Sequence, residues 1–466
     1  MRGFEVSEVA LNQSLSGKRI TIIGSGVSGR GMASLASELG AAVFVTDRGA
    51  VDETAKALFR ERGVGWEEGG HTDRCLEADL VVAGSGIPPH APVILEAQKR
   101  GVPVSGELDF LAPWLDGRII GVTGSNGKST TTALIGHMLK KKGLSVAVAG
   151  NIGESMADSA LRRWDFIVVE LSSFQLHWNT RFSCSLAVVT NLAPDHLDWH
   201  GSYGEYVRSK SRIITTLKEG GAVIVQRRDC SALGAPFSGK MCVPFSWREG
   251  TETAERGISL TADGDRRITF LHSGETEEKL FDFDELPLIG RHNIENASMA
   301  AATVRLAGAG DGEGGLFSGF KGLPHRCEKV SEFGGILFVD DSKGTNVAST
   351  CTALTSIEGK KAVILGGQGK GEDYAPLAET VAREAVAAVV IGAEKGKIMD
   401  ALLRAGFKGA TEAKSLDDGV PMAVRALGGG GVVLLSPACT SWDMYPNYGA
   451  RGDHFKKIVL SMRKGP

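Results

Sequence analysis

The sequence has few cysteines, no long apolar run and no excess of either charge. It contains 7 cysteines in 466 residues and no Cys-x-x-Cys pair, so neither a disulfide framework nor a zinc site of that spacing is indicated. The longest apolar runs have only the length of a strand, as in VVLL at 432–435, which excludes a transmembrane helix. The formal net charge of -3 comes without a basic run, which argues against a nucleic-acid surface.

These absences indicate where the chain works. The opening residues, MRGFEVSEVALNQSLSGKR, lack the apolar core of a secretion signal. Scattered thiols are typical of a reducing compartment. We therefore expect a cytoplasmic protein with free thiols, a monomer that has neither a membrane nor a nucleic-acid partner.

Glycine, in contrast, is abundant, with 62 residues, many of them directly after apolar runs. Three blocks open with a strand that leads into a polar or glycine-rich turn: KRITIIGSG at 18–26, RIIGVTG at 118–124 and ILFVDD at 336–341. Short β-branched runs that alternate with helical stretches predict parallel sheets with right-handed crossovers. A chain of 466 residues is also too long for one core. The predicted fold class is α/β, with three consecutive α/β domains.

The domain boundaries are placed where the pattern loosens. Residues 1–106 form a Rossmann-like domain, residues 107–322 a central phosphate-loop domain, and residues 323–466 a second Rossmann-like domain. Residues 245–284 are polar, alternating and rich in turns, which predicts a small antiparallel β appendage on the central domain. A helix is expected over 293–307.

The stretch GVTGSNGKST at 121–130 has the Gly-Lys-Ser ending of a phosphate loop, although Val122 stands where the strict pattern has a glycine. Backbone N–H groups and the dipole at a helix N-terminus attract phosphate. Lys128 can offer its charge to the β- and γ-phosphates, and Ser129 its hydroxyl to Mg²⁺. The alternative is a plain turn that binds nothing. The strand–loop–helix context favours ATP.

A metal site is predicted beside this loop. Glu170 ends the strand DFIVVE, and the next strand leads into NLAPDHLDWH, which carries His196, Asp198 and His200. The carboxyl ends of parallel strands meet at one edge of a sheet, and hard cations prefer oxygen ligands with some nitrogen. These side chains could instead cap neighbouring helices. The residue types alone leave open which member of the segment binds metal.

The first block carries a possible nucleotide site. Gly24, Gly26 and Gly29 follow a strand and open a helix, while Asp47 ends the next strand at the distance of a ribose-binding acid. Arg48 could serve a phosphate or lie in solvent. The pattern indicates a nucleotide diphosphate without naming it, so an NAD-dependent dehydrogenase remains an alternative.

The third block has cations and hydroxyls at successive strand ends, in DDSKGTN, GGQGKGEDY and SPACTSWDMYPNYGARG. Such groups suit an anionic small molecule, although loops that merely turn corners would carry similar charges. From its residues alone the chain is therefore interpreted as an ATP-using enzyme with a second nucleotide pocket and a third site for a charged small molecule.

Several motifs together resemble the Mur ligase family. They are TGSNGKST, GNIG, VVELSSFQL, NLAPDHLD, RHNIENA, GLPHRCE, DDSKGTN and LLSPACTSWD, in order from about residue 18 to the C-terminus. The family's own phosphate loop has this glycine spacing. The resemblance, strongest to members that add D-glutamate, implies ATP-dependent ligation of D-glutamate to UDP-N-acetylmuramoyl-L-alanine through an acyl phosphate in cytoplasmic peptidoglycan synthesis.

The resemblance also implies roles for individual residues. The catalytic residues would be Lys128, Glu170, His196 and Lys210. The ATP-binding residues would be Gly124, Ser125, Asn126, Gly127, Lys128, Ser129, Thr130, Asn293, Asn296, Arg326 and Asp341. The UDP-substrate would be bound by Ser28, Asp47, Arg48, Asn151, Ser172, Gln175 and His196. D-Glutamate would be bound by Lys343, Thr345, Lys370, Ser441 and Tyr448. Mg²⁺ would be held by Ser129, Glu170, His196 and a carbamylated Lys210.

The sequence departs from the family in small ways. Tyr448 stands where many members have phenylalanine, and the interval from His196 to Lys210 is slightly short, so the loop GSYGEY differs. Three alternatives stay open: a sibling ligase that adds L-alanine, the dehydrogenase, and a nucleotide-gated switch without chemistry.

Overall fold

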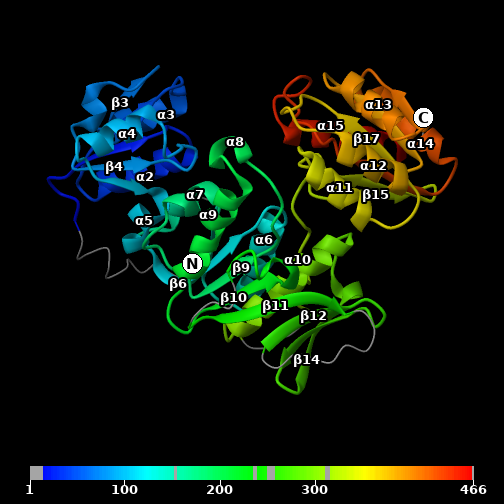
Figure 1. Cartoon of the computed structure of the whole chain (residues 1–466), viewed down its shortest axis with the longest axis horizontal. Coiled ribbons are helices and arrows are strands. Elements are labelled where there is room, and N and C mark those ends of the chain that lie inside the picture. The colour runs from blue at the N-terminus through cyan, green and yellow to red at the C-terminus, as the bar shows by residue number, and fades with distance from the viewer. Residues whose placement is uncertain (1–13, 152–154, 235–238, 249–257, 310–314, 464–466) are drawn as a thin grey trace. The chain divides into compact units, whose positions relative to one another are not determined.

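The computed structural model describes residues 14–151, 155–234, 239–248, 258–309 and 315–463. Three β-sheets with flanking helices follow one another along the chain, which confirms the predicted α/β class (Figure 1). The chain divides into two compact units. The first runs to Phe283 and includes Asn296–Ser318, and the second comprises Asp284–Glu295 and the residues from Gly319 onward. The boundaries after residues 106 and 322 stay a prediction.

The first sheet is parallel and has the order β3-β2-β1-β4-β5. Its strands are β1 (Arg19–Ile23), β2 (Ala42–Asp47), β3 (Gly65–Glu68), β4 (Leu80–Ala83) and β5 (Val104–Gly106). Its helices are α2 (Val27–Glu38), α3 (Glu53–Glu61), α4 (Pro92–Lys99) and α5 (Glu107–Leu111). The strand order reverses between β1 and β4, and such a reversal opens a crevice at the carboxyl ends of the strands.

The central sheet has the order β14-β13-β12-β11-β10-β9-β6-β8-β7. Its strands are β6 (Asp116–Thr123), β7 (Val146–Gly150), β8 (Arg163–Glu170), β9 (Leu186–Val189), β10 (Ala222–Gln226), β11 (Met241–Arg248), β12 (Ile258–Asp263), β13 (Ile268–Ser273) and β14 (Thr276–Asp282). Its helices are α6 (Lys128–Lys141), α7 (Ser173–Trp178), α8 (Leu197–His200), α9 (Tyr203–Thr215) and α10 (Arg291–Leu306). The predicted β appendage is present as the antiparallel strands β12, β13 and β14, but they extend this sheet because β12 pairs with β11 in parallel.

The third sheet has the order β15-β16-β20-β17-β18-β19, with β15 antiparallel to β16 at one edge. Its strands are β15 (Glu328–Phe333), β16 (Ile336–Asp340), β17 (Lys361–Gly366), β18 (Ala387–Ile391), β19 (Ala410–Glu412) and β20 (Gly431–Leu435). Its helices are α11 (Val347–Ser356), α12 (Ala375–Glu384), α13 (Lys395–Arg404), α14 (Leu416–Leu427) and α15 (Tyr448–Arg463). Alternate side chains of a strand point to opposite faces. Val363 and Leu365 of β17 accordingly enter one apolar core, and Ala362 and Ile364 enter the other.

One apolar core joins the first sheet to the central sheet. It includes Met32 and Leu35 of α2 together with Met156 and Ala157 of a short 3₁₀ segment that follows β7. The packing is close: a Cβ on Gly31 would lie 2.5 Å from the Ser155 Oγ. Helix α2 of the first sheet therefore packs directly on the segment that follows β7 of the central sheet.

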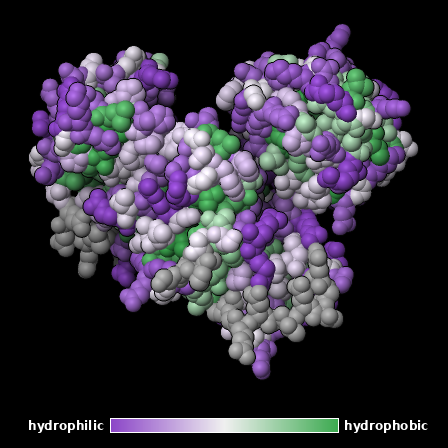
Figure 2. Space-filling model, viewed as in Figure 1, coloured by the Kyte–Doolittle hydropathy of each residue, from purple (hydrophilic) through white to green (hydrophobic). Residues whose placement is uncertain are grey.

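The surface in Figure 2 is largely hydrophilic, with small scattered hydrophobic areas. Among the helices that the structure describes, none is both long enough and apolar enough to cross a bilayer.

Candidate active site

The phosphate-loop stretch lies between β6 and α6, as its strand–loop–helix pattern predicts. Gly124 and Gly127 have φ values of +138° and +84°, in the region that favours glycine. A Cβ on Gly124 would lie 2.0 Å from the Thr190 Oγ1, and one on Gly127 would lie 2.2 Å from the Asn296 Oδ1. Both glycines are therefore required for the loop to pass its neighbours.

The residues after β9 hold the loop from one side. Thr190 Oγ1 and Asn191 Nδ2 donate to the Asn126 carbonyl at 2.5 and 2.9 Å, and the Asn126 N–H donates to Asn191 Oδ1 at 3.0 Å. Ser125 Oγ accepts from the Ala193 N–H at 2.8 Å. The side chain of Ser125 therefore fixes the loop, and Ser129 and Thr130 at the start of α6 are buried.

Two lysines meet at one carbonyl of the loop. Lys128 Nζ donates to the Gly124 carbonyl at 2.9 Å and to the Ser125 carbonyl at 2.8 Å. Lys210 Nζ, on α9, donates to the same Gly124 carbonyl at 2.7 Å and lies 4.7 Å from the centre of the Tyr206 ring. Lys210 is 1% exposed. Burial lowers its pKa well below the usual value, and the charge of Lys128 lowers the pKa further.

Glu170 lies at the end of β8, where the sequence predicts it. It is 4% exposed, and among the described residues its Oε2 has no hydrogen-bond partner. Buried carboxylate oxygens are normally paired, so an unpartnered one is suited to bind a cation.

His196 begins α8 with a φ of +53°, unusual for a residue with a Cβ. Its Nε2 lies 3.5 Å from the Asp195 Oδ2. Burial lowers the pKa of His196, and the nearby Lys128 and Lys210 act in the same direction against the charge of Asp195. An imidazole that stays neutral keeps a nitrogen lone pair for a metal.

A cavity of about 370 Å³ opens beside these groups. It is lined by Ser85, Gly86, Lys128, Asn151, Ser172, Ser173, Phe174, Asp195, His196, Tyr206 and Lys210. Five predicted site residues therefore share one cavity: Lys128, Asn151, Ser172, His196 and Lys210. Ser85 and Gly86 come from the loop after β4, so the cavity is bordered by both the first and the central sheet.

One other predicted residue, Gln175, lies directly behind this lining and is bonded to Ser172. Ser172 caps α7: its Oγ accepts from the Gln175 N–H at 3.1 Å, while Gln175 Oε1 accepts from the Ser172 N–H at 2.9 Å. This reciprocal capping box fixes the start of α7. Gln175 is 2% exposed, so its side chain supports the cavity wall without lining it.

The predicted residues of the first sheet lie outside the cavity. Asp47 accepts from the Ser25 N–H and the Ser25 hydroxyl, both at 2.7 Å, and from the Gly49 N–H at 2.8 Å. Burial raises the pKa of Asp47, but these hydrogen bonds outweigh burial and lower its pKa overall. The carboxylate thus holds the glycine turn after β1. Ser28 lies at the start of α2, and Arg48 is exposed directly after β2.

Asn293 and Asn296 both belong to α10, which matches the predicted helix to within two residues. The Asn296 side chain lies against Gly127, and its Oδ1 accepts from Thr131 Oγ1 at 3.4 Å. Asn293 Nδ2 donates to the Ile289 carbonyl at 2.7 Å.

In the second unit, Asp341 follows β16 and is 8% exposed. Ser436 Oγ donates to its Oδ2 at 2.7 Å, and the Cys327 N–H donates to its Oδ1 at 3.2 Å. Burial raises the pKa of Asp341 to about 7, against these two hydrogen bonds. Arg326 directly precedes Cys327.

The predicted D-glutamate residues lie on three loops of this unit and at the start of α15. Lys343 Nζ lies 4.0 Å from the centre of the Tyr448 ring, and Thr345 N–H donates to the Lys343 carbonyl at 2.8 Å. The loop that carries the exposed Lys370 joins the loop that carries the buried Ser441 through Gln368 and Thr440, whose backbones exchange hydrogen bonds of 3.0 and 2.9 Å.

Arg451 connects these loops, and no motif in the sequence marks it as a site residue. It is 1% exposed, donates from Nε to Ser342 Oγ at 2.9 Å, and donates from Nη2 to the Ser342 carbonyl at 2.8 Å. It also donates to the carbonyls of Cys439 and Thr440 at 3.1 and 3.2 Å. A lone arginine in the segment YGARG gives no signal of such a role.

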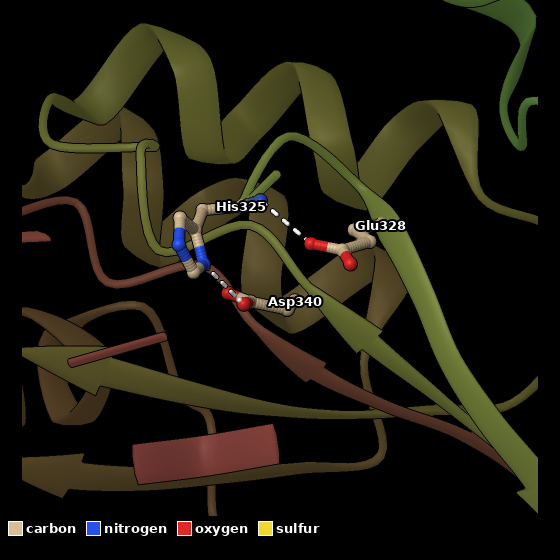
Figure 3. Close-up of side chains that lie close together, drawn as sticks. All are labelled: His325, Glu328 and Asp340. Carbon is tan, nitrogen blue, oxygen red and sulfur yellow. Dashed lines mark hydrogen bonds and ion pairs between the residues drawn. The ribbon is translucent and has the colours of Figure 1, made fainter. Parts of the chain in front are cut away.

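A second cluster, shown in Figure 3, has the composition of a metal site. The possible ligand atoms of His325, Glu328 and Asp340 lie within 4.8 Å of one another. However, His325 Nδ1 lies 2.7 Å from Asp340 Oδ2, and Glu328 Oε2 accepts from the His325 N–H at 2.8 Å and lies 2.7 Å from Lys456 Nζ. Because a lysine neutralises this carboxylate, we assign the cluster a structural role. The His325 carbonyl accepts from the Lys343 N–H at 3.1 Å, so the cluster supports the loop that carries Lys343.

The three serial sheets and the Gly-Lys-Ser loop define the class of phosphate-loop α/β proteins. Residues 19–93 match the MurD N-terminal domain, residues 122–304 match the Mur ligase middle domain, and residues 325–439 match the glutamate ligase domain of the Mur ligases. The chain belongs to the Mur ligase family. This result confirms the resemblance that the motifs indicate.

Relatives and solved structures agree with this assignment. The UDP-N-acetylmuramoylalanine–D-glutamate ligase of Bacteroides fragilis is 38% identical over 455 residues, which cover 96% of this chain and 100% of the relative. That of Salinibacter ruber is 36% identical over 458 residues, covering 95% and 98%. The structure of the UDP-N-acetylmuramate-alanine ligase MurC from Thermotoga maritima is similar in fold, with a TM-score of 0.54 at 20% identity over 96% of this chain and 100% of that one.

Proposed function

We propose that this chain is an ATP-dependent ligase that joins D-glutamate to UDP-N-acetylmuramoyl-L-alanine. The observation that carries the proposal is the pair of lysine side chains, Lys128 and Lys210, whose Nζ groups both donate to the Gly124 carbonyl of a phosphate loop, beside a cavity shared with Asn151, Ser172 and His196. A site of this kind is suited to bring a phosphoryl donor to a carboxylate.

The reaction has two steps. An oxygen of the alanyl carboxylate attacks the γ-phosphorus of ATP, the bond to the β,γ-bridging oxygen breaks, and ADP leaves. The free amine of D-glutamate then attacks the carbonyl carbon of the acyl phosphate. The tetrahedral intermediate expels orthophosphate, and the nitrogen loses a proton to give the amide. A carboxylate is a poor electrophile, so the phosphorylation is what makes amide formation possible.

Lys128 is proposed to stabilise the charge on the transferring phosphoryl group. Backbone N–H groups at the start of α6 add to this stabilisation, because phosphoryl transfer depends mostly on positioning and electrostatics. The remaining loop residues of the predicted ATP set, Gly124 to Thr130, are proposed to shape the phosphate site, while Asn293, Asn296, Arg326 and Asp341 are proposed to bind the rest of the nucleotide.

The residues beside the loop fit a magnesium ion. The unpartnered Oε2 of Glu170 supplies the observation for this fit, and the oxygen-rich donor set suits a hard cation. Ser129, Glu170, His196 and Lys210 would hold the ion, which would neutralise phosphate charge when bound.

Lys210 can help to bind the magnesium ion only if its side chain loses its positive charge. Its lowered pKa favours the neutral amine, whose lone pair can attack the carbon of CO₂ to form an N–C bond and release a proton. The resulting carbamate is anionic and offers oxygen ligands. We propose that Lys210 is carbamylated in the working enzyme.

The two remaining substrates are assigned to the remaining predicted residues. Ser28, Asp47, Arg48, Asn151, Ser172, Gln175 and His196 are proposed to serve the UDP-substrate. Lys343, Thr345, Lys370, Ser441 and Tyr448 are proposed to bind D-glutamate. We further propose a cytoplasmic monomer with boundaries after residues 106 and 322.

The test is the release of orthophosphate from ATP by the purified chain with magnesium, UDP-N-acetylmuramoyl-L-alanine and D-glutamate. We expect release that depends on both substrates, and an amide product of matching amount. Release that requires L-alanine and UDP-N-acetylmuramate instead would identify the sibling activity, and quenching of nicotinamide fluorescence would favour the dehydrogenase. Absence of orthophosphate release would end the proposal.

A further inference from the structure

Glu107 is a buried acid that no part of the proposed chemistry uses. It begins α5, directly after β5, and is 3% exposed. In the part of the chain that the structure describes, no cation forms an ion pair with it. Burial raises its pKa, against hydrogen bonds from Gln175 and Ser28. A buried carboxyl without a cation is unfavourable for folding, so its partners are informative.

Those partners come from two helix starts that border the proposed UDP-substrate site. Gln175 Nε2, on α7, donates to Glu107 Oε2 at 3.1 Å. The hydroxyl of Ser28, on α2, faces the same carboxyl group and acts to lower its pKa. The start of α2 follows the glycine turn of the first sheet. Its N-cap residue is Gly26, which has no side chain to cap the helix.

The Gln175 amide links Ser172 to this acid, one end to each. The Ser172 N–H can only donate, so it requires the Gln175 Oε1, which lies 2.9 Å away. The Nε2 group must then face the other way and find an acceptor, which Glu107 provides. Ser172 lines the cavity, so Glu107 acts on the cavity wall through Gln175.

We propose that Glu107 is a positioning residue for the nucleotide-sugar: it holds the starts of α2 and α7 in register so that they bind one UDP-substrate together. This inference rests on the proposed function. The close packing of Gly106 supports a fixed geometry, because a Cβ there would lie 2.2 Å from the Trp178 Cβ at the end of α7. The end of α7 therefore lies against the residue that precedes α5, with no space for a side chain between them.

Asp109 provides a matched control on the same helix. It is 5% exposed and accepts from the N–H groups of Thr180, Arg181 and Phe182 at 2.9 Å, and from the Thr180 hydroxyl at 2.5 Å. Its partners are backbone groups that follow α7 and do not line the cavity. Asp109 therefore stabilises the fold, whereas Glu107 orients side chains at the site.

The experiment compares Glu107→Gln with Asp109→Asn in the full chain. Isothermal titration with UDP-N-acetylmuramoyl-L-alanine measures binding without turnover, and orthophosphate release gives KM and kcat. Glutamine keeps the size of Glu107 but carries no charge and has one acceptor oxygen in place of two. We expect Kd and KM for the UDP-substrate to rise about tenfold, with kcat and the KM values for ATP and D-glutamate within about twofold, because the hydrogen bond that Gln175 donates is weakened or lost. Asp109→Asn should lower Tm and leave Kd unchanged.

An unchanged Kd in Glu107→Gln, or an equal rise in all three KM values, would overturn the inference. If Glu107→Gln does not fold, Glu107→Asp decides, because it keeps the carboxyl group but shortens its reach toward Gln175: a several-fold rise in Kd supports the inference and an unchanged Kd refutes it. Wild-type orthophosphate release is scored separately. A wild type that binds the nucleotide-sugar tightly but releases no orthophosphate would defeat the proposed reaction and leave the binding comparison intact.

Discussion

Replacing Arg451 by lysine should weaken both the second unit and the affinity for D-glutamate. The guanidinium makes four hydrogen bonds of 2.8 to 3.2 Å to Ser342, Cys439 and Thr440. Burial lowers the pKa of Arg451 to about 10. The group is planar and presents its donors as a fork, which a lysine ammonium cannot reproduce.

The magnitude follows from the bonds that lysine loses. The lysine side chain is shorter and ends in a single ammonium group, so it can keep about two of the four contacts. Each hydrogen bond to a charged group contributes about 1.5 to 3 kcal/mol. The expected loss in the free energy of unfolding is therefore about 3 to 6 kcal/mol, a large share of the 5 to 15 kcal/mol typical of a domain. Because the loops of Ser342 and Thr440 carry proposed D-glutamate ligands, KM for D-glutamate should rise at least about tenfold, since each tenfold step corresponds to about 1.4 kcal/mol.

Urea denaturation and orthophosphate release measure these effects in the same samples. Arg404→Lys is the control: Arg404 is exposed at the end of α13, and its replacement should change stability by less than about 0.5 kcal/mol. If Arg451→Lys loses less than about 1 kcal/mol and keeps the wild-type KM for D-glutamate, the argument that Arg451 organises these loops is wrong.

Three further substitutions test the site. Gly127→Ala should lower ATP affinity at least about tenfold and stability by about 1 to 3 kcal/mol, because φ is +84° and the new Cβ would lie 2.2 Å from Asn296. Nucleotide titration and denaturation measure the two effects. The control is Gly143→Ala, where φ is +78° and nothing lies within 4 Å of the new Cβ. Glu170→Gln should raise the magnesium concentration for half-maximal activity at least about tenfold with little loss of Tm, and an unchanged magnesium requirement would contradict the metal assignment. The pKa of Asp341 is raised to about 7, so the folded state keeps a proton that the unfolded state loses near pH 4, and stability should fall as pH rises from 4 to 7. Asp341→Asn should remove that part of the slope in Tm measured against pH, and parallel slopes for the two proteins would disprove it.

Sequence patterns predict those parts of the site that depend on local order. Strand, turn and helix follow one another within 121–130, so the phosphate loop and Lys128 could be found without the structure. Glu170 could be found because it ends a buried strand, and strand ends of a parallel sheet gather at one edge. The paired registers of β6 with β8 and β9 bear this out.

Contacts between distant segments could not be predicted in this way. Lys210 lies in the helical stretch EYVRSKSRI, where its burial is decided by packing against β6 and the loop, more than 80 residues away in sequence. Glu107 and Arg451 likewise interact across segments that no periodicity connects. The sequence also does not predict that β12 extends the central sheet. Alternation of polar and apolar residues indicates that a segment is a strand but not which strand it pairs with.

The arrangement of Lys128 and Lys210 explains why the loop is built for an anion. The Nζ groups of both lysines donate to the Gly124 carbonyl. A positive charge on Lys128 therefore makes a second positive charge, on Lys210, unfavourable. The lowered pKa of Lys210 is the electrostatic consequence, with burial as the larger cause and Lys128 as the next. A phosphate at the start of α6 would compensate the positive charge of the two lysines. Conversion of Lys210 to an anionic carbamate would remove the repulsion between them. The same buried position that makes a charged lysine unfavourable therefore makes the neutral amine reactive, so the fold supplies both the phosphate site and the condition for the proposed carbamate.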